Sequence, residues 1–243
     1  MVIWIRRKLL LEAVLTLAVF CGMTAVLWQS PAAVPAAAES ASVGERLGYV
    51  LDAGHGGEDG GAVAGDGTVE SGLNLAIALS LNDILRFCGQ ETRLTRSGDD
   101  AVYSEGAATL RQKKVSDLKN RVELVNQTKN GVLVSIHQNA LPASPAVHGA
   151  QVFYNTVPGS DELAAKIQEV LNGTVNAGNE KHCKKIPDSI YLMKNVTTPA
   201  VLIECGFLSN SEETAMLRNP EYQKKLAASI AGGVLAEREK ETE

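Results

Sequence analysis

Two histidines of this sequence stand where an apolar run meets a turn. His55 lies in the turn Asp-Ala-Gly-His-Gly-Gly that follows the run starting at Gly48, and His137 ends the run starting at Gly131. Both runs are typical of buried strands, and open α/β sheets bind ligands where such strands end. The glycines around His55 let the backbone bend with little side-chain bulk beside the imidazole. The pattern therefore predicts a metal site shared by the two imidazoles.

Glu70 offers a third ligand of a suitable type. An apolar pattern with helical spacing runs from Leu73 to Leu85, which places Glu70 at the first turn of a helix predicted over residues 71–87. Two histidines and one glutamate would form a His2Glu site for Zn2+ whose fourth position stays open to water. That arrangement is found in hydrolytic zinc sites rather than structural ones.

Glu204 is the fourth side chain that can do chemistry. It follows the apolar run of residues 200–203, and we expect it at the end of a strand. A carboxylate beside a buried strand is costly unless it has a partner or a task. We therefore count Glu204 among the functional groups of the site.

The elements that must position these groups indicate an α/β fold. Six short strand-like runs alternate with helical patterns, which predicts a single domain with a twisted, mixed and largely parallel sheet of about six strands, flanked by helices. The strands are expected at residues 48–52, 91–95, 131–137, 150–154, 190–194 and 200–203. Helices are expected at residues 71–87, around 118–125, at 160–171, from 211, and at 219–240.

The N-terminal segment predicts export. Three basic residues, Arg6-Arg7-Lys8, precede an apolar run over residues 9–28 that only Glu12 interrupts, and such a run is long enough to cross a bilayer. We expect residues 1–28 to be a membrane anchor or a signal peptide, with an uncleaved anchor favoured. Residues 29–46, rich in Ala, Pro and Ser, are the expected linker to a catalytic domain over residues 47–240 outside the cytoplasm.

Composition excludes other classes of protein. A formal net charge of -5 argues against nucleic acid as a partner. The four cysteines contain no Cys-x-x-Cys pair, so neither a disulfide framework nor a thiolate metal site is expected. With 243 residues and 45% hydrophobic composition, the chain holds one substantial domain beside its N-terminal segment.

Four sequence blocks carry a family resemblance. They are the turn with His55, the stretch from Glu70 to Leu75, the block Ser-Ile-His-Gln-Asn-Ala around His137, and the block Pro-Ala-Val-Leu-Ile-Glu-Cys-Gly-Phe-Leu-Ser-Asn around Glu204. Together they resemble the zinc-dependent N-acetylmuramoyl-L-alanine amidases of the Amidase_3 type, in the family's order over residues 48–237. Gly60 and Val69 depart from the family pattern, which commonly has a proline and a basic residue there.

This resemblance implies a phosphorylase/hydrolase-like fold and a reaction. The amide between the lactyl group of N-acetylmuramic acid and L-alanine, the first residue of the peptidoglycan stem peptide, would be hydrolysed. His55, Glu70 and His137 would hold Zn2+, and Glu204 would act as general base and then return the proton to the leaving amine.

Within the family, the sporulation-associated, germination-specific amidases resemble this chain most in architecture, because they pair one N-terminal membrane segment with a bare catalytic domain. There, removal of stem peptides prepares muramic acid for conversion into the muramic-δ-lactam of spore cortex. The resemblance implies peptidoglycan, a lipoprotein activator and a muramic acid deacetylase acting in sequence as partners. A vegetative autolysin or cell-separation amidase, a zinc peptidase acting on wall peptides and a non-catalytic wall-binding domain remain as alternatives.

Some polar residues are left open between structural and functional roles. Arg96 and Arg121 match family arginines and fit structural ion pairs as well as substrate contacts. Asn139 is expected to orient the site from behind its ligands. His148 and His182 are expected to be plain loop residues.

Overall fold

A computed structural model describes residues 48–241, with the side chains of residues 48–236. The predicted membrane anchor or signal peptide and the whole predicted linker lie outside the described residues. No described helix is both long and apolar enough to span a membrane. The elements are β1 (Gly48–Ala53), α2 (Glu70–Phe87), β2 (Glu91–Leu94), α3 (Leu110–Asn126), β3 (Gly131–Asn139), β4 (Gln151–Tyr154), α4 (Ser160–Thr174), β5 (Lys184–Lys185), α5 (Tyr191–Asn195), β6 (Ala200–Phe207), α6 (Ser211–Leu217) and α7 (Pro220–Glu241).

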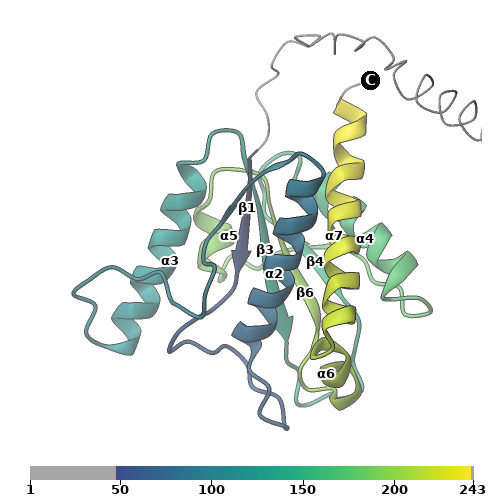
Figure 1. Cartoon of the computed structure of the whole chain (residues 1–243), viewed down its shortest axis with the longest axis horizontal. Helices are drawn as coiled ribbons and strands as arrows, with labels where there is room; N and C mark the ends of the chain where they lie inside the picture. The colour runs from purple at the N-terminus through teal and green to yellow at the C-terminus, as the bar shows by residue number, and fades with distance from the viewer. Residues whose placement is uncertain (1–47, 242–243) are drawn as a thin grey trace, which may run out of the picture. The chain divides into compact units, whose positions relative to one another are not determined.

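The strands form one sheet in the order β2-β1-β3-β6-β4-β5 (Figure 1). Strands β2, β1, β3 and β6 are parallel, whereas β4 runs antiparallel to β6 and parallel to β5. The prediction of a mixed, largely parallel six-stranded sheet is thereby confirmed. Because β1, β3 and β6 are adjacent and parallel, their carboxyl ends meet at one edge of the sheet, where ligands of such folds bind.

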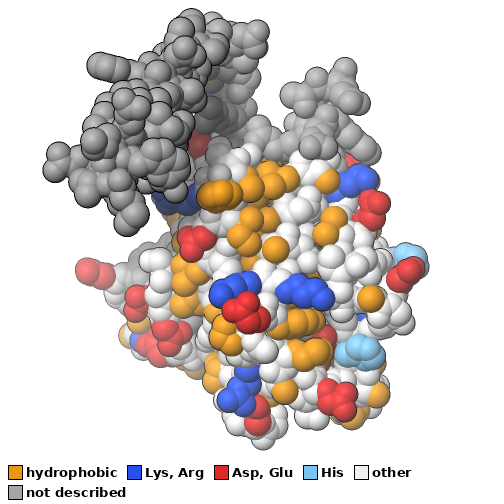
Figure 2. All heavy atoms as spheres, turned by 45° about the vertical axis from the view of Figure 1, so that its right-hand side comes forward, with side chains coloured by type: hydrophobic (Ala, Val, Ile, Leu, Met, Phe, Trp, Pro, Cys, Tyr) orange, Lys and Arg blue, Asp and Glu red, His pale blue; other side chains and the backbone are white. Residues whose placement is uncertain are grey.

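Successive strand residues point to opposite faces of the sheet. Leu51 packs on the face covered by α2, α4 and α7, while its neighbour Val50 packs on the face covered by α3 and α5 (Figure 1). The outer surface seen in Figure 2 mixes apolar side chains with charges of both signs. The same alternation turns His137 and Glu204 toward the layer of α3 and α5, because they share a face with Leu133 and Leu202.

A buried ion pair ties α3 to the end of β1. Arg121 Nη1 lies 2.6 Å from Asp52 Oδ1, and both side chains are almost fully buried. Burial alone would raise the pKa of Asp52, but the charge of Arg121 and a hydrogen bond from Ser135 hold it below its usual value. Arg121 also donates to the carbonyl of His55 at 2.7 Å and pairs with Asp117. Arg121 therefore has a structural role, and it fixes the backbone of the His55 turn.

Replacing Arg121 with Met should destabilise the fold by about 3–5 kcal/mol, because it leaves two carboxylates without their buried cation. The free energy of unfolding in urea measures this loss. Arg111→Met on the exposed side of the same helix is the control and should change stability little. An Arg121→Met protein as stable as the wild type would contradict the structural role.

Three predictions on local structure were wrong. Residues 190–194 are not a strand, since Tyr191–Asn195 forms helix α5. The sheet still has six strands, because the short strand β5 takes the place of the one predicted there. Leu192 and Met193 are adjacent yet both buried, as on the inner side of a helix. Strand β6 does not end at Glu204 but continues to Phe207, pairing with Asn139. The third concerns α6, where the Ser-Glu-Glu start at Ser211 predicts an N-cap at Ser211; the cap is instead Asn210, whose side chain accepts from two backbone N–H groups.

Candidate metal centre

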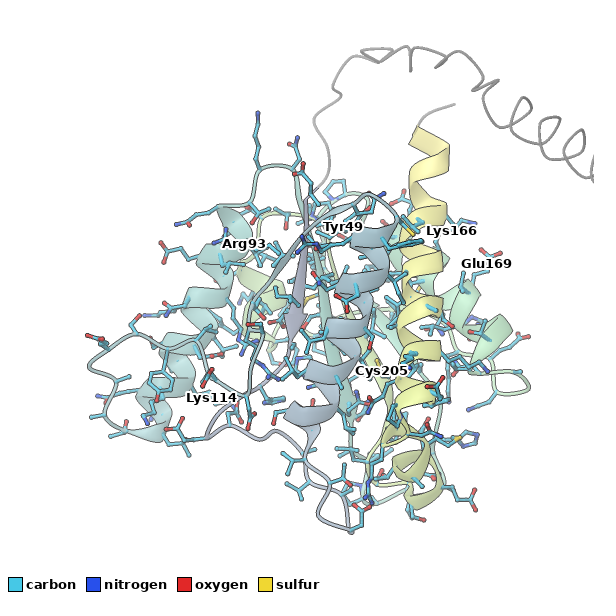
Figure 3. The ribbon with its side chains drawn as sticks, viewed as in Figure 1. Tyr49, Arg93, Lys114, Lys166, Glu169 and Cys205 are labelled. Carbon is cyan, nitrogen blue, oxygen red and sulfur yellow. The ribbon has the colours of Figure 1, made fainter. Side chains whose placement is uncertain are left out.

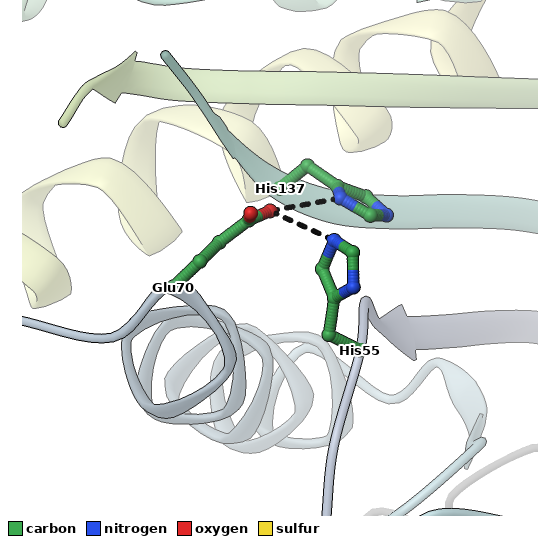
Figure 4. A group of neighbouring side chains, drawn as sticks. All are labelled: His55, Glu70 and His137. Carbon is green, nitrogen blue, oxygen red and sulfur yellow. Dashed lines mark hydrogen bonds and ion pairs between the residues drawn. The ribbon is translucent and has the colours of Figure 1, made fainter. Parts of the chain in front are cut away.

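Two histidines and a glutamate converge at the carboxyl edge of the parallel strands. His55 follows β1, Glu70 is the first residue of α2, and His137 lies near the end of β3. One ligand atom of each lies within 4.8 Å of the others, with Glu70 between the two imidazoles (Figure 4). The structure therefore brings together the three residues that the sequence analysis proposed as ligands.

Glu70 is held as a buried anion. Its Oε1 lies 3.0 Å from His137 Nδ1 and 3.4 Å from His55 Nε2, and its Oε2 accepts from the backbone N–H of Ala62 at 2.8 Å. Burial alone would raise the pKa of Glu70, but its hydrogen bonds to the two histidines lower it further than burial raises it. The first turn of a helix also favours a carboxylate, because free N–H groups point there.

The turn around His55 aims one ring nitrogen at the site. His55 has a φ of +63°, a left-handed conformation that is uncommon outside glycine. Its Nδ1 lies 3.0 Å from Asp59 Oδ2, which leaves Nε2 facing Glu70. A carboxylate on the far nitrogen fixes the tautomer and orientation of a metal-binding histidine. Asp59 therefore supports His55 from outside the ligand group.

The His137 imidazole is packed directly against the backbone of Gly54. A Cβ atom added at Gly54 would lie 2.2 Å from His137 Nε2, well inside van der Waals contact. The absence of a side chain at this position is thus required for the ring to occupy its place. This explains why the glycine before His55 matters to a ligand on another strand.

Glu204 stands beside His137 on the neighbouring strand. The two residues are in register in the β3–β6 pair, so their side chains share one face of the sheet. Glu204 Oε2 is buried, and no described residue gives it a hydrogen bond. Burial raises the pKa of Glu204 to about 7, and the Glu70 charge adds to this, although the two histidines oppose it. Such a carboxyl can exchange a proton at neutral pH.

These groups open onto a cavity of about 330 Å³ between the sheet edge, α3 and the segment before α5. His55, His137 and Glu204 line it. Two imidazoles and a carboxylate suit a zinc ion, and Glu204 lines the same cavity beside them. The donor set present in this chain thus fits a catalytic metal site.

Comparison with known proteins decides the family. The sequence profile of Amidase_3, described as N-acetylmuramoyl-L-alanine amidase, matches residues 50–236. The chain belongs to the Amidase_3 family.

Several Amidase_3 relatives share most of its length. A germination-specific N-acetylmuramoyl-L-alanine amidase of Bacillus subtilis (strain 168) is 42% identical over 186 residues, covering 76% of this chain and 77% of the relative. The amidase AmiA of Escherichia coli (strain K12) is 30% identical over 238 residues, with 80% and 77% covered. The solved structure of the CwlD amidase from Clostridioides difficile in complex with the GerS lipoprotein is 41% identical, with a TM-score of 0.76 over 79% of this chain and 98% of that one.

The sequence analysis did not identify most of the side chains that contact the candidate ligands of this Amidase_3 site. The amide that contacts Glu70 belongs to Asn74, at 3.2 Å, and not to Asn139, and Asn74 in turn accepts from Gln138. Asn74 lies one helical turn after Glu70, a spacing that could have signalled the contact. His148 and His182 lie outside the group formed by His55, Glu70 and His137.

Asp59→Asn should weaken zinc binding by about 10- to 100-fold without unfolding the protein, because His55 loses the charged partner that fixes its tautomer. Competition with a chromophoric chelator measures the affinity. Asp66→Asn, in the exposed part of the same Amidase_3 loop, is the matched control and should bind zinc as the wild type does. Unchanged affinity in Asp59→Asn would rule out the supporting role.

Gly54→Ala should lower zinc affinity more than it lowers stability, because the new methyl group displaces the His137 ring. Zinc affinity and the free energy of unfolding of the metal-free protein are measured side by side. Gly72→Ala, at an open position within α2, serves as control. It should leave zinc affinity unchanged and raise stability by about 0.5–1 kcal/mol. Wild-type affinity in Gly54→Ala would show that His137 does not need this space.

Proposed function

We propose that this Amidase_3 protein is a zinc-dependent N-acetylmuramoyl-L-alanine amidase of spore cortex. It would cut the amide between the lactyl group of N-acetylmuramic acid and L-alanine of the stem peptide, during cortex maturation and germination. The observation that carries the proposal is the group of His55, Glu70 and His137 with the unpartnered carboxyl of Glu204 beside it. A relative that is 42% identical bears the germination-specific name.

In this proposal His55, Glu70 and His137 hold the zinc ion. When bound, zinc lowers the pKa of water toward ~7 and polarises a carbonyl group. Asp59 keeps the His55 ring oriented, and the backbone N–H groups of Ala62 and Gln138 keep Glu70 in place.

Glu204 moves the proton. Its Oε2 has no competing partner among the described residues, so it is free to accept a proton from the attacking water. With a pKa raised to about 7, the resulting carboxylic acid is strong enough to pass that proton to the nitrogen of the leaving L-alanine. One side chain thus serves both halves of the hydrolysis.

We further propose an exported, membrane-anchored enzyme with partners. Residues 9–28 would anchor the catalytic domain, residues 47–240, to the extracytoplasmic face of the membrane. The structural relative from Clostridioides difficile was solved in complex with a lipoprotein, which supports a lipoprotein activator here. A muramic acid deacetylase would act in sequence, because δ-lactam formation needs both the stem peptide and the N-acetyl group removed.

Digestion of cortex peptidoglycan tests the reaction. The purified protein is incubated with and without zinc, and products are read by mass spectrometry. Release of whole stem peptides that begin with L-alanine, stopped by a chelator, is the expected result. Shortened peptides still attached to muramic acid would indicate a zinc peptidase, and binding without cleavage would indicate a wall-binding domain.

A second experiment separates the cortex role from a vegetative one. Deleting the gene in a spore-forming host should leave vegetative cell separation normal and yield cortex without muramic-δ-lactam. Chaining of vegetative cells with normal cortex would favour a cell-separation amidase instead.

A further inference from the structure

Among the described residues that line the cavity beside the candidate metal centre, one cation, Lys114, is exposed enough to exchange its partner. Helix α3 contributes three charged side chains to its wall, Lys114, Asp117 and Arg121. Arg121 is buried and holds Asp117 at 2.6 Å, so neither is free to meet a ligand. The side chain of Lys114 is 52% exposed, and among the described residues its ion-pair partner is Asp59, whose Oδ2 lies 3.1 Å from the ammonium. Figure 3 shows Lys114 on α3, toward the end of the molecule to which β1 points.

The pair between Lys114 and Asp59 can open without leaving a group stranded. Exposed ion pairs contribute little to stability, so their partners exchange readily. Asp59 keeps its contact with His55 Nδ1 at 3.0 Å when Lys114 moves away. A carboxylate brought by a ligand can therefore replace Asp59 as the counter-ion of Lys114.

Lys114 is connected through Asp59 to the imidazole of His55, a candidate metal ligand. Its ammonium is one hydrogen bond from Asp59, which is one hydrogen bond from the imidazole of His55. The two contacts share Asp59 Oδ2 and measure 3.1 and 3.0 Å, so Lys114 Nζ lies about 6 Å or less from His55 Nδ1. Two extended peptide residues span about 7 Å, which covers this distance. A substrate whose scissile amide lies at the metal centre would place its next residue near Lys114.

The wall between α3 and α5 is otherwise largely apolar. Leu118, Leu192 and Leu202 line it, and the rim residues Ile190 and Tyr191 are 38% and 41% exposed. Such a wall suits the methyl group of L-alanine and carries no charge of its own. Ser189 is an exposed polar side chain of the same lining, and Lys114 is the exposed one among the described lining residues that carries a positive charge to pair with an anion.

We infer that Lys114 is a specificity residue, whose ammonium binds the free α-carboxylate of the stem residue that follows L-alanine. The muramic acid side of the scissile amide brings no carboxylate, since its lactyl carboxyl is consumed in that amide. The stem peptide brings a free α-carboxylate when its second residue is a glutamate that is linked onward through its side-chain carboxyl. Lys114 thus marks the peptide side of the cavity. This inference rests on the proposed amidase function and names the part of the substrate that is selected.

Paired substrates that differ in one group test the inference. Uncross-linked glycan strands are made with either the free α-carboxylate or the primary amide on the second stem residue. The values of kcat and KM are measured on both strands for the zinc-loaded wild type, Lys114→Gln and Lys119→Gln. Lys119 is exposed on α3 and lines a separate groove, so it controls for the loss of one positive charge.

The wild type should prefer the acidic strand by about tenfold in kcat/KM. Lys114→Gln should lose this preference through a higher KM for the acidic strand, while Lys119→Gln keeps it. The zinc content of both variants should equal that of the wild type. Equal cleavage of both strands by the wild type would overturn the inference. The inference would also be overturned if Lys114→Gln lost its bound zinc and cleaved both strands more slowly. Lys114 would then act only by supporting Asp59. Cleavage of neither strand by zinc-loaded wild type would overturn the proposed function as well.

Discussion

Replacing Glu204 with Gln should slow the hydrolysis of peptidoglycan by about 10²- to 10⁴-fold while leaving zinc binding intact. The amide has the shape of the carboxyl group but cannot accept a proton. Glu204 lies beside His137 in register but is not one of the three converging ligands, so the metal group keeps its geometry. Release of stem peptides is followed by mass spectrometry, and zinc content by atomic emission.

The pH profile sharpens this test. Because burial raises the pKa of Glu204 to about 7, protonation below that pH should remove the base and lower kcat/KM in the wild type. The residual activity of Glu204→Gln should lack this acidic limb. Glu213→Gln is the control for a buried carboxyl that bonds only backbone N–H groups, those of Gly149 and Phe207. It should lower stability without removing the acidic limb. Wild-type turnover in Glu204→Gln would exclude the proton-transfer role.

Removing any one of the three ligands should abolish stoichiometric zinc binding. In His55→Ala, Glu70→Ala and His137→Ala the ion keeps only two protein donors, whereas catalytic zinc sites use three. Added zinc at a thousand times its Kd should stabilise the wild type by about 4 kcal/mol and raise its Tm, but it should leave the Tm of these variants nearly unchanged.

Two loop histidines provide the matched controls for the ligand variants. His148→Ala and His182→Ala remove an imidazole outside the metal group, so their Tm should rise with zinc as in the wild type. Full zinc retention in all three ligand variants would refute the proposed set. Retention in one alone would remove that residue from the set.

The sequence predicted most of what brings the site together. Buried parallel strands are continuous apolar runs in the sequence, and such runs predicted the positions of β1 and β3. The first turn of α2 was clear from its apolar spacing, and both histidines and Glu70 could be placed at element ends. Their convergence in the structure follows from the parallel pairing of β1 with β3. Their roles as ligands remain predictions.

What the sequence did not predict depends on irregular backbone and long-range contacts. Asp59 reaches His55 only because the turn passes through a left-handed residue, which the residue type alone does not signal. The pair of Asp52 and Arg121 joins residues far apart in the chain. Residues 190–194 form a short apolar run, and such runs fit a strand or a helix equally well until their packing is known.

The position of β6 bears on when the enzyme becomes able to cut. This strand is the last in the sequence, yet it lies inside the sheet, between β3 and β4. A nascent chain that ends before residue 200 lacks the strand between β3 and β4, and with it Glu204. The proton transfer proposed for Glu204 therefore becomes possible only after nearly the whole catalytic domain has been synthesised and folded.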